Sequence, residues 1–180
     1  MKKKSSKVLL GVAALVAGIY LILKKRRTIP KGVKAVRPLD VKKYMGKWYE
    51  IARIDHLYEK GLNKTTAEYA VDKDGSILVT NRGYNPRNGK FVEAHGKAVF
   101  ADSPEEGKLK VSFFGPFSAG YNVIQIDKDY HNALIAGEDF DHLWLLSRNP
   151  IMSNEVKKSL LDTAVSYGYD VSRLNWVMHH

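Results

Sequence analysis

The segment KTTAEYAVD, residues 64–72, shows the pattern that decides the fold, because apolar and polar side chains alternate along it. Alternation with a period of two is typical of a strand that has one face in a core and the other in water. The segment KLKVSFF, residues 108–114, repeats the pattern. The apolar sides of the two segments are Ala67, Tyr69 and Val71, and Leu109, Val111 and Phe113. Both segments therefore predict half-buried antiparallel strands.

Similar β-rich runs fill most of the chain, separated by turn signals such as Asp74-Gly75 and Ser103-Pro104-Glu105-Glu106-Gly107. The expected strands are residues 47–54, 64–72, 76–84, 90–100, 108–114, 121–127, 132–137 and 142–148. Eight up-and-down strands avoid exposed edges by closing on themselves. The sequence thus predicts an all-β fold, an eight-stranded up-and-down antiparallel β-barrel, which is wide enough to hold one small ligand.

The period changes after the eighth run. An apolar stripe at helical spacing predicts one C-terminal α-helix, with Ser153 as its cap and Gly168 as its stop. The stripe is formed by Val156, Leu160, Leu161, Ala164 and Val165. The run 174–178 predicts a short final strand at an edge.

The amino-terminal segment, residues 1–27, is an apolar run between basic clusters. The run VLLGVAALVAGIYLIL, residues 8–23, would span roughly 24 Å as a helix, against roughly 30 Å for the hydrocarbon core of a bilayer. No small-residue cleavage site follows it, which favours an uncleaved membrane anchor over a removed signal segment. Residues 28–37 are expected to form a basic tether, and residues 38–180 the folded domain.

Charge is concentrated in the same region. The first 37 residues hold 11 Lys and Arg with no Asp or Glu, so the remaining chain is close to neutral although the whole carries +10. A nucleic-acid-binding domain would carry its basic patch on the folded part. The sequence therefore predicts contact with a membrane and none with nucleic acid.

Several kinds of chemistry are excluded or unsupported by composition and motifs. The chain has no cysteine, which rules out disulfides, thiolate metal sites and cysteine nucleophiles. No metal site, cofactor or catalytic group is expected, since no catalytic or phosphate-binding motif occurs. The histidines lack the spacing of metal ligands; they are His56, His95, His131, His142, His179 and His180. Glu50 lies two residues after Trp48, so its side chain is expected on the same face of the strand. An inward Glu50 is the one candidate for a general base.

Three short motifs carry a family resemblance. Gly46-Lys47-Trp48 resembles the Gly-x-Trp signature of the lipocalins, Asp129-Tyr130 resembles their second motif, and Arg148 resembles their third. The surrounding sequence, including KWYEIARIDHLYEKGL and LWLLSRNP, resembles the bacterial outer-membrane lipocalins of the lipoprotein type over about residues 38–178. The resemblance implies a barrel that encloses a ligand, called a calyx.

Connectivity alone brings the three motifs together at one end of the barrel. We expect Trp48 to plug this closed end, with the Arg148 guanidinium stacked on its indole, in structural rather than catalytic roles. The loops at 55–63, 85–89, 115–120 and 138–141 would surround the open end. Apolar groups expected at this mouth are Leu57, Tyr58, Phe117 and Phe140. A tether that enters at the first strand would point the mouth away from the anchoring membrane.

An apolar calyx with few reactive groups is expected to bind a ligand and not to act as an enzyme. Candidates for its wall are Tyr69, Val71, Ile77, Val79, Ala94, Phe100, Leu109, Phe113 and Trp144. The resemblance implies fatty acids or lysophospholipids as ligands, stored or transported for envelope maintenance under stress, and a possible homodimer. Two alternatives stay open. One is an envelope enzyme that acts on a lipid or pigment with Glu50 or a mouth histidine as base, and the other is a barrel that binds a protein partner.

The resemblance also bears on location. Relatives in this group are tethered by an acylated cysteine, which this chain lacks, so the apolar run 8–23 would have to serve as the anchor. The expected place is the bacterial cell envelope with the domain facing the periplasm. Whether the anchoring membrane is the outer or the inner one stays open.

Overall fold

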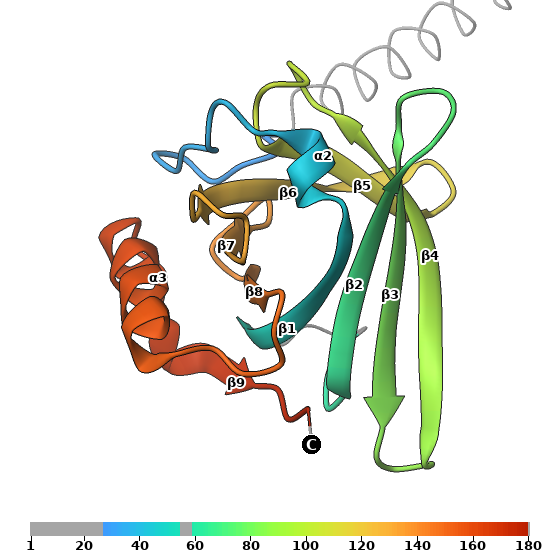
Figure 1. The fold of residues 1–180 in the computed structure, drawn as a ribbon, viewed down its shortest axis with the longest axis vertical. Helices are drawn as coiled ribbons and strands as arrows, with labels where there is room; N and C mark the ends of the chain where they lie inside the picture. Colours follow the sequence, from blue (N-terminus) through green and yellow to red (C-terminus); the bar gives the residue numbers. More distant parts are fainter. Residues whose placement is uncertain (1–26, 55–58, 180) are drawn as a thin grey trace, which may run out of the picture.

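A computed structural model describes residues 27–54 and 59–179 and shows a closed antiparallel barrel with one long helix against its side (Figure 1). The sheet order is β2-β3-β4-β5-β6-β7-β8-β1, and a β1–β2 pairing closes the ring. The strands are β1 (Gly46–Ile54), β2 (Asn63–Val71), β3 (Ile77–Asn85), β4 (Lys90–Phe100), β5 (Lys108–Phe114), β6 (Phe117–Ile126), β7 (Asn132–Ala136) and β8 (Leu143–Ser147). The predicted eight-stranded barrel is confirmed.

A short ninth strand, β9 (Leu174–Trp176), pairs with the end of β1. Near the closed end β1 pairs with β2, from Gly46 opposite Tyr69 to Tyr49 opposite Thr66, and beyond that point the two strands separate. The chain after β9 bridges them, because the Val177 amide donates to Ile51 O and the Lys64 amide donates to Met178 O. The C-terminal segment therefore completes the wall between β1 and β2.

Among residues 27–54 and 59–179 the helices are the 13-residue α3 (Asn154–Ser166) and two short ones, α2 (Val41–Tyr44) and the 3₁₀ turn η1 (Val171–Arg173). Ser153 caps α3 as expected, since its side chain accepts from the Val156 amide. Single-turn helices carry no periodic pattern, so α2 and η1 were not predicted. Each is held by a capping aspartate, Asp40 for α2 and Asp170 for η1.

Two apolar clusters hold the fold. The inner cluster lies inside the barrel; its fully buried members include Trp48, Val123 and Ile135. The outer cluster lies between α3 and the outer faces of β1, β7 and β8, and includes Leu134, Leu145 and Leu160. Because α3 covers them, β7 and β8 are buried on both faces, whereas the sequence predicted one wet face for each strand.

Strand β6 begins at Phe117, before the expected start at residue 121. The Ser112 hydroxyl explains the difference, since it contacts both Gly115 O at 3.0 Å and Phe117 O at 2.7 Å across the hairpin. Gly115 has a φ of +55°, which glycine adopts without strain. Together these features extend the β5–β6 hairpin into a tight turn.

Residues 28–35 lie along the outside of the barrel, whereas Val36 and Leu39 pack into the inner cluster. The Val36 amide donates to Val123 O and the Leu39 amide to Glu105 O, both at 2.8 Å, and Val33 is buried in the outer cluster. The described chain therefore starts beside β6 and reaches the closed end at Val36 to Leu39, just before α2. The chain enters β1 at the closed end, through Leu39 and α2, and the segment before Val36 packs against the barrel wall.

The apolar helix expected at residues 8–23 lies outside the described residues. Within residues 27–54 and 59–179, no helix has the length and apolar character needed to cross a membrane.

Candidate functional site

Arg148 seals the closed end of the barrel. Its guanidinium carbon lies 3.9 Å from the centre of the Trp48 ring, which is the stacking expected from the sequence. Its terminal nitrogens donate to backbone carbonyls at 2.7 to 3.1 Å; the acceptors are Lys43, Tyr44, Met45 and Lys47. The Trp48 indole N–H also donates to Tyr44 O. This arrangement favours structural roles for Trp48 and Arg148, because the Arg148 bonds tie the end of β8 to α2 and to the start of β1.

The other motif residues surround this plug. The Tyr130 hydroxyl accepts from the Asp40 amide at 2.8 Å, and Tyr130 O accepts from Arg148 Nε, so Tyr130 holds the start of α2. Gly46 has a φ of +89°, and a Cβ there would lie 3.5 Å from the Arg148 guanidinium. Asp129 is exposed in the turn before β7.

Three tyrosine hydroxyls meet above the plug. The Tyr121 hydroxyl lies 2.6 Å from that of Tyr44 and 2.8 Å from that of Tyr69. Burial is the main cause that raises the pKa of all three phenols above their usual 10.0. These tyrosines therefore stay protonated well above neutral pH and act as neutral hydrogen-bonding groups.

This tyrosine cluster predicts a loss of stability in alkali. A phenol whose pKa is raised in the folded state contributes stability that is fully present below the unfolded value, about pH 10, and is lost as pH rises through the folded value. Thermal unfolding followed by circular dichroism should show a fall in Tm above about pH 10. The fall should be smaller in Tyr69→Phe/Tyr121→Phe than in the partly exposed Tyr84→Phe control. Equal slopes for the two variants would show that the cluster plays no part.

The floor of the barrel is tightly packed. A cavity of about 10 Å³ lies among Leu39, Val41, Tyr44, Met45, Tyr69, Ile77, Ala98, Leu109, Val111 and Tyr121. This volume suits about one water molecule. The floor therefore has no room for a larger ligand.

The structure places the predicted wall residues in different positions. Tyr69, Ile77, Val79 and Leu109 are buried in the inner cluster, and Phe100, Phe113 and Trp144 pack against it. Ala94 is half-buried on β4 opposite Asn81. Val71 differs, since it ends β2 at the closed end with 53% of its surface exposed. We therefore leave Val71 out of the proposed wall, and the ligand contacts of the others stay a prediction.

Toward the mouth, the inward face of the barrel carries small side chains. Alternation along β4 from the buried Ala98 puts Gly96 and Ala94 on the inner face, and Ala119 on β6 pairs with the inward Val111. Phe113 lies so close to Gly96 that a Cβ there would be 2.8 Å from the ring. The Phe113 ring thus packs directly over Gly96, and the side chains at positions 94 and 119 are no larger than a methyl group.

A buried ion pair stands on the inner wall nearer the mouth. Arg53 Nη1 lies 2.5 Å from Glu50 Oε1 and 3.3 Å from the Thr65 hydroxyl, and Arg53 is fully buried. Its other terminal nitrogen donates to the carbonyls of Glu59 and Leu62. Glu50 does point inward, but as the partner of a guanidinium. This pairing favours a structural carboxylate over a general base.

The alternation of side chains along β1 did not predict that Arg53 faces the inside of the barrel. A bulge between Glu50 and Ala52 shifts the register, so Ile51, Ala52 and Ile54 face the outer cluster and Arg53 turns inward. The only signal in the sequence is an arginine within an otherwise apolar run.

The predicted mouth residues are only partly described. Leu57 and Tyr58 lie outside the described residues. Phe117 lies at the tip of the β5–β6 hairpin with 80% of its surface exposed. Phe140 packs edge-on against Tyr169, with ring centres 5.0 Å apart, and therefore contacts the segment after α3.

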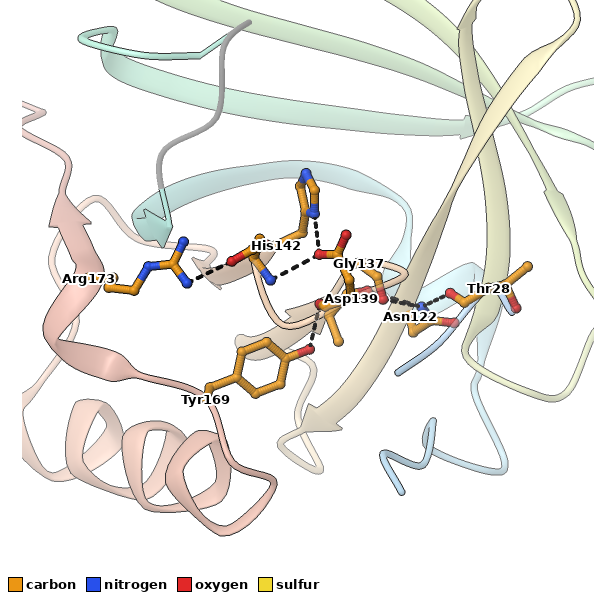
Figure 2. A network of polar contacts seen from close by, with 9 residues as sticks. Thr28, Asn122, Gly137, Asp139, His142, Tyr169 and Arg173 are labelled. Atoms are coloured by element: carbon orange, nitrogen blue, oxygen red, sulfur yellow. Dashed lines mark hydrogen bonds and ion pairs between the residues drawn. The ribbon is translucent and has the colours of Figure 1, made fainter. Parts of the chain in front are cut away.

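Polar contacts fix the turn between β7 and β8 (Figure 2). His142 Nδ1 lies 2.6 Å from Asp139, Arg173 lies 2.7 Å from Asp141, and the Tyr169 hydroxyl donates to Asp139 O. In the part of the chain that the structure describes, no group of three or more acidic, His or Cys side chains is placed to hold a metal ion.

Sequence comparison places the chain among known proteins. Residues 39–179 match the lipocalin-like domain family. The chain is 49% identical to the outer membrane lipoprotein Blc of Escherichia coli K12 over 166 residues, covering 92% of this chain and 94% of that protein. It is 43% identical over 150 residues to the Vibrio cholerae protein of the same name, with 83% and 88% covered. Temperature-induced lipocalin-1 of Arabidopsis thaliana is 39% identical over 157 residues, with 82% and 83% covered.

Solved structures share the fold at lower identity. Insecticyanin from the tobacco hornworm aligns with a TM-score of 0.67 and 22% identity, over 84% of this chain and 86% of that one. The cockroach allergen Per a 4 aligns with a TM-score of 0.66 and 21% identity, over 84% and 95%. Together with the closed barrel and the Trp48–Arg148 plug, the matches establish that the chain belongs to the lipocalin family, whose members bind hydrophobic ligands.

Proposed function

We propose that the barrel binds the acyl chain of a fatty acid or lysophospholipid, and that the protein stores or transports this lipid for maintenance of the cell envelope. The observation that carries the proposal is the inner face of the barrel. It is largely apolar, with neutral tyrosine hydroxyls at the floor and the charged Glu50–Arg53 pair toward the mouth.

This division suits a ligand with one apolar and one polar end. Glu50 and Arg53 lie on the inner wall toward the mouth, and the Trp144 indole N–H donates to Glu59 nearby at 3.1 Å. Asn81 Oδ1 is buried on the same wall and accepts no hydrogen bond from the described residues. A glycerol hydroxyl of a lysophospholipid would satisfy it by donating a hydrogen bond, whereas the ionised carboxylate of a fatty acid only accepts.

The free energy available to an acyl chain is sufficient. About 14 methylenes at roughly 0.8 kcal/mol each give about 11 kcal/mol gross. After an association cost of at least about 4 kcal/mol, micromolar or tighter binding is within reach. Residence without chemical change fits a family of binding proteins, and the paired Glu50 gives no support to an enzyme.

For location, we propose an envelope protein held by residues 1–27 as a membrane anchor, with residues 28–37 as its link to the domain and the domain facing the periplasm. Bacterial relatives named outer membrane lipoproteins support the envelope placement. Since the chain has no cysteine to acylate, the apolar run 8–23 takes over anchoring. A homodimer stays a prediction, which analytical ultracentrifugation would test.

Ala94→Trp should abolish binding of a fluorescent fatty acid to the full chain in a titration, because the indole would fill the space above the floor. His95→Trp is the matched control, since the side chain of His95 points outward and is 73% exposed. Its Kd should equal that of the parent. Circular dichroism confirms that both variants fold. Unchanged binding by a folded Ala94→Trp protein, or no binding by the parent, would contradict the proposal.

A further inference from the structure

The first described residues lie on the outside of the barrel near the β5–β6 hairpin. Asn122 Nδ2 donates to Thr28 O at 2.6 Å and to the carbonyls of Ala136 and Gly137 at 3.1 Å, beside the turn that leads to β8 (Figure 2). Gly120 is covered by Thr28 so closely that a Cβ would collide with its carbonyl. The chain thus enters three residues along β6 from Phe117, a distance of about 10 Å.

Cations surround this point of entry. An open cavity of about 320 Å³ is lined by residues 27–33 together with Lys108. Arg27 and Lys31 are exposed there, and the exposed Lys110 lies opposite Gly120 on the same outer face. One carboxylate, Asp102, lies 2.5 Å from Lys108 and balances it. Arg27, Lys31 and Lys110 add three further positive charges to this face.

The β5–β6 hairpin ends in exposed aromatic rings, four residues beyond Lys110 and six beyond Lys108 along β5. Phe114 is 64% exposed and Phe117 is 80% exposed, on either side of Gly115-Pro116. Apolar rings next to lysines and arginines are typical of surfaces that lie in the headgroup region of a bilayer. The chain outside the described part agrees, because the apolar run 8–23 ends four residues before Arg27 and Lys24, Lys25 and Arg26 fill the interval.

We propose that this face, made of Arg27, Lys31, Lys110 and the hairpin residues Phe114 and Phe117, docks on a bilayer that contains anionic phospholipid. The two rings insert among the acyl chains and the cations contact headgroup phosphates. The β5–β6 side of the mouth then faces the membrane from which the chain emerges, so a lipid could pass between that membrane and the barrel.

The absence of cysteine allows a direct test by site-directed spin labelling of the full chain in vesicles. Ser118→Cys places a label at the hairpin and Lys128→Cys places one just beyond the other end of β6; both positions are exposed. In vesicles of phosphatidylcholine with phosphatidylglycerol, the Ser118 label should be more accessible to oxygen than to a water-soluble nickel complex. The Lys128 label should show the reverse.

Charge variants test the role of the cations. Lys31→Glu/Lys110→Glu should return the Ser118 label to water, because each cation lost is expected to weaken docking about fivefold. Lys42→Glu/Lys73→Glu makes the same charge change at exposed positions toward the closed end and should leave the label inserted. Vesicles of phosphatidylcholine alone should reproduce the effect of the first variant.

Equal water accessibility of the two labels would overturn the proposal. So would dipolar coupling between Ser118 labels on two chains, which would assign the hairpin to a second copy. Fatty-acid titration of the same variants separates this proposal from the proposed function, since Ser118, Lys31 and Lys110 lie on the outer face. Lost docking with intact binding would overturn only the docking surface.

Discussion

Glu50→Gln is expected to lower the free energy of unfolding by about 3–5 kcal/mol. The substitution keeps the size of the side chain but removes the negative charge that faces the fully buried Arg53 guanidinium at 2.5 Å. A buried cation that loses its counter-charge costs much more than the pair contributes, because both charges have already been removed from water. Urea unfolding followed by fluorescence of the native tryptophans measures the change.

The double variant Glu50→Gln/Arg53→Met identifies the cause. Removing both charges should recover much of the lost stability, since an apolar side chain of similar length replaces the guanidinium. A double variant as unstable as the sum of the two single variants would show that the charges do not act as a pair. A Glu50→Gln protein that stays stable but loses a lipid-modifying activity of the parent would instead support the enzymatic alternative.

Arg148→Ala is the second substitution with a large expected effect, a loss of at least about 3 kcal/mol. The guanidinium donates to five backbone carbonyls and stacks on Trp48, so its removal unties α2 from β1 and from the turn before β7. Arg148→Lys should recover little, because an ammonium group cannot supply the planar fork of donors. Thermal unfolding of each variant gives the comparison.

Asp129→Ala is the matched control for the closed end. Asp129 belongs to the same motif but is exposed, so its replacement should change stability by less than about 0.5 kcal/mol. Trp48→Ala should cost about 3–5 kcal/mol alone. The double variant Trp48→Ala/Arg148→Ala should lose less stability than the sum of the two single losses, because the two residues share one contact. Full additivity would contradict the role of Arg148 as a stacked partner of Trp48.

Alternation and turn signals predicted the barrel, because each strand of a meander has one inner and one outer face and its own sequence alternates accordingly. The strands β4 and β5 begin and end at the predicted residues, and Ser153 caps α3 as its side chain suggested. The Trp48–Arg148 contact was predictable too, since connectivity alone brings the start of β1 and the end of β8 to one end.

Features that depend on long-range packing were not predictable. The bulge after Glu50 reverses the facing of β1, which places Arg53 inside and Ala52 outside. Burial of β7 on both faces follows from the position of α3, which no local pattern encodes. Phe140 was expected at the mouth because it lies in a mouth loop, but its ring packs on Tyr169 from a distant part of the chain.

The packing of residues 28–40 also could not be predicted from the sequence. Their basic, proline-containing sequence is typical of a free linker, and only the hydrogen bonds from Asn122 and Val36 show that the segment lies on the barrel. This packing places the earlier part of the segment on the barrel wall, although the chain still enters β1 at the closed end. It brings the start of the described chain close to the hairpin that we propose as a membrane contact.

Lipid mass spectrometry of the full chain, purified from cells in mild detergent, tests the central claim most directly. One acyl lipid per chain is predicted for the parent and for His95→Trp, and none for Ala94→Trp. A parent protein that carries no lipid and takes up no fatty acid, or an equal amount of lipid on Ala94→Trp, would contradict a lipid carrier whose ligand lies inside the barrel.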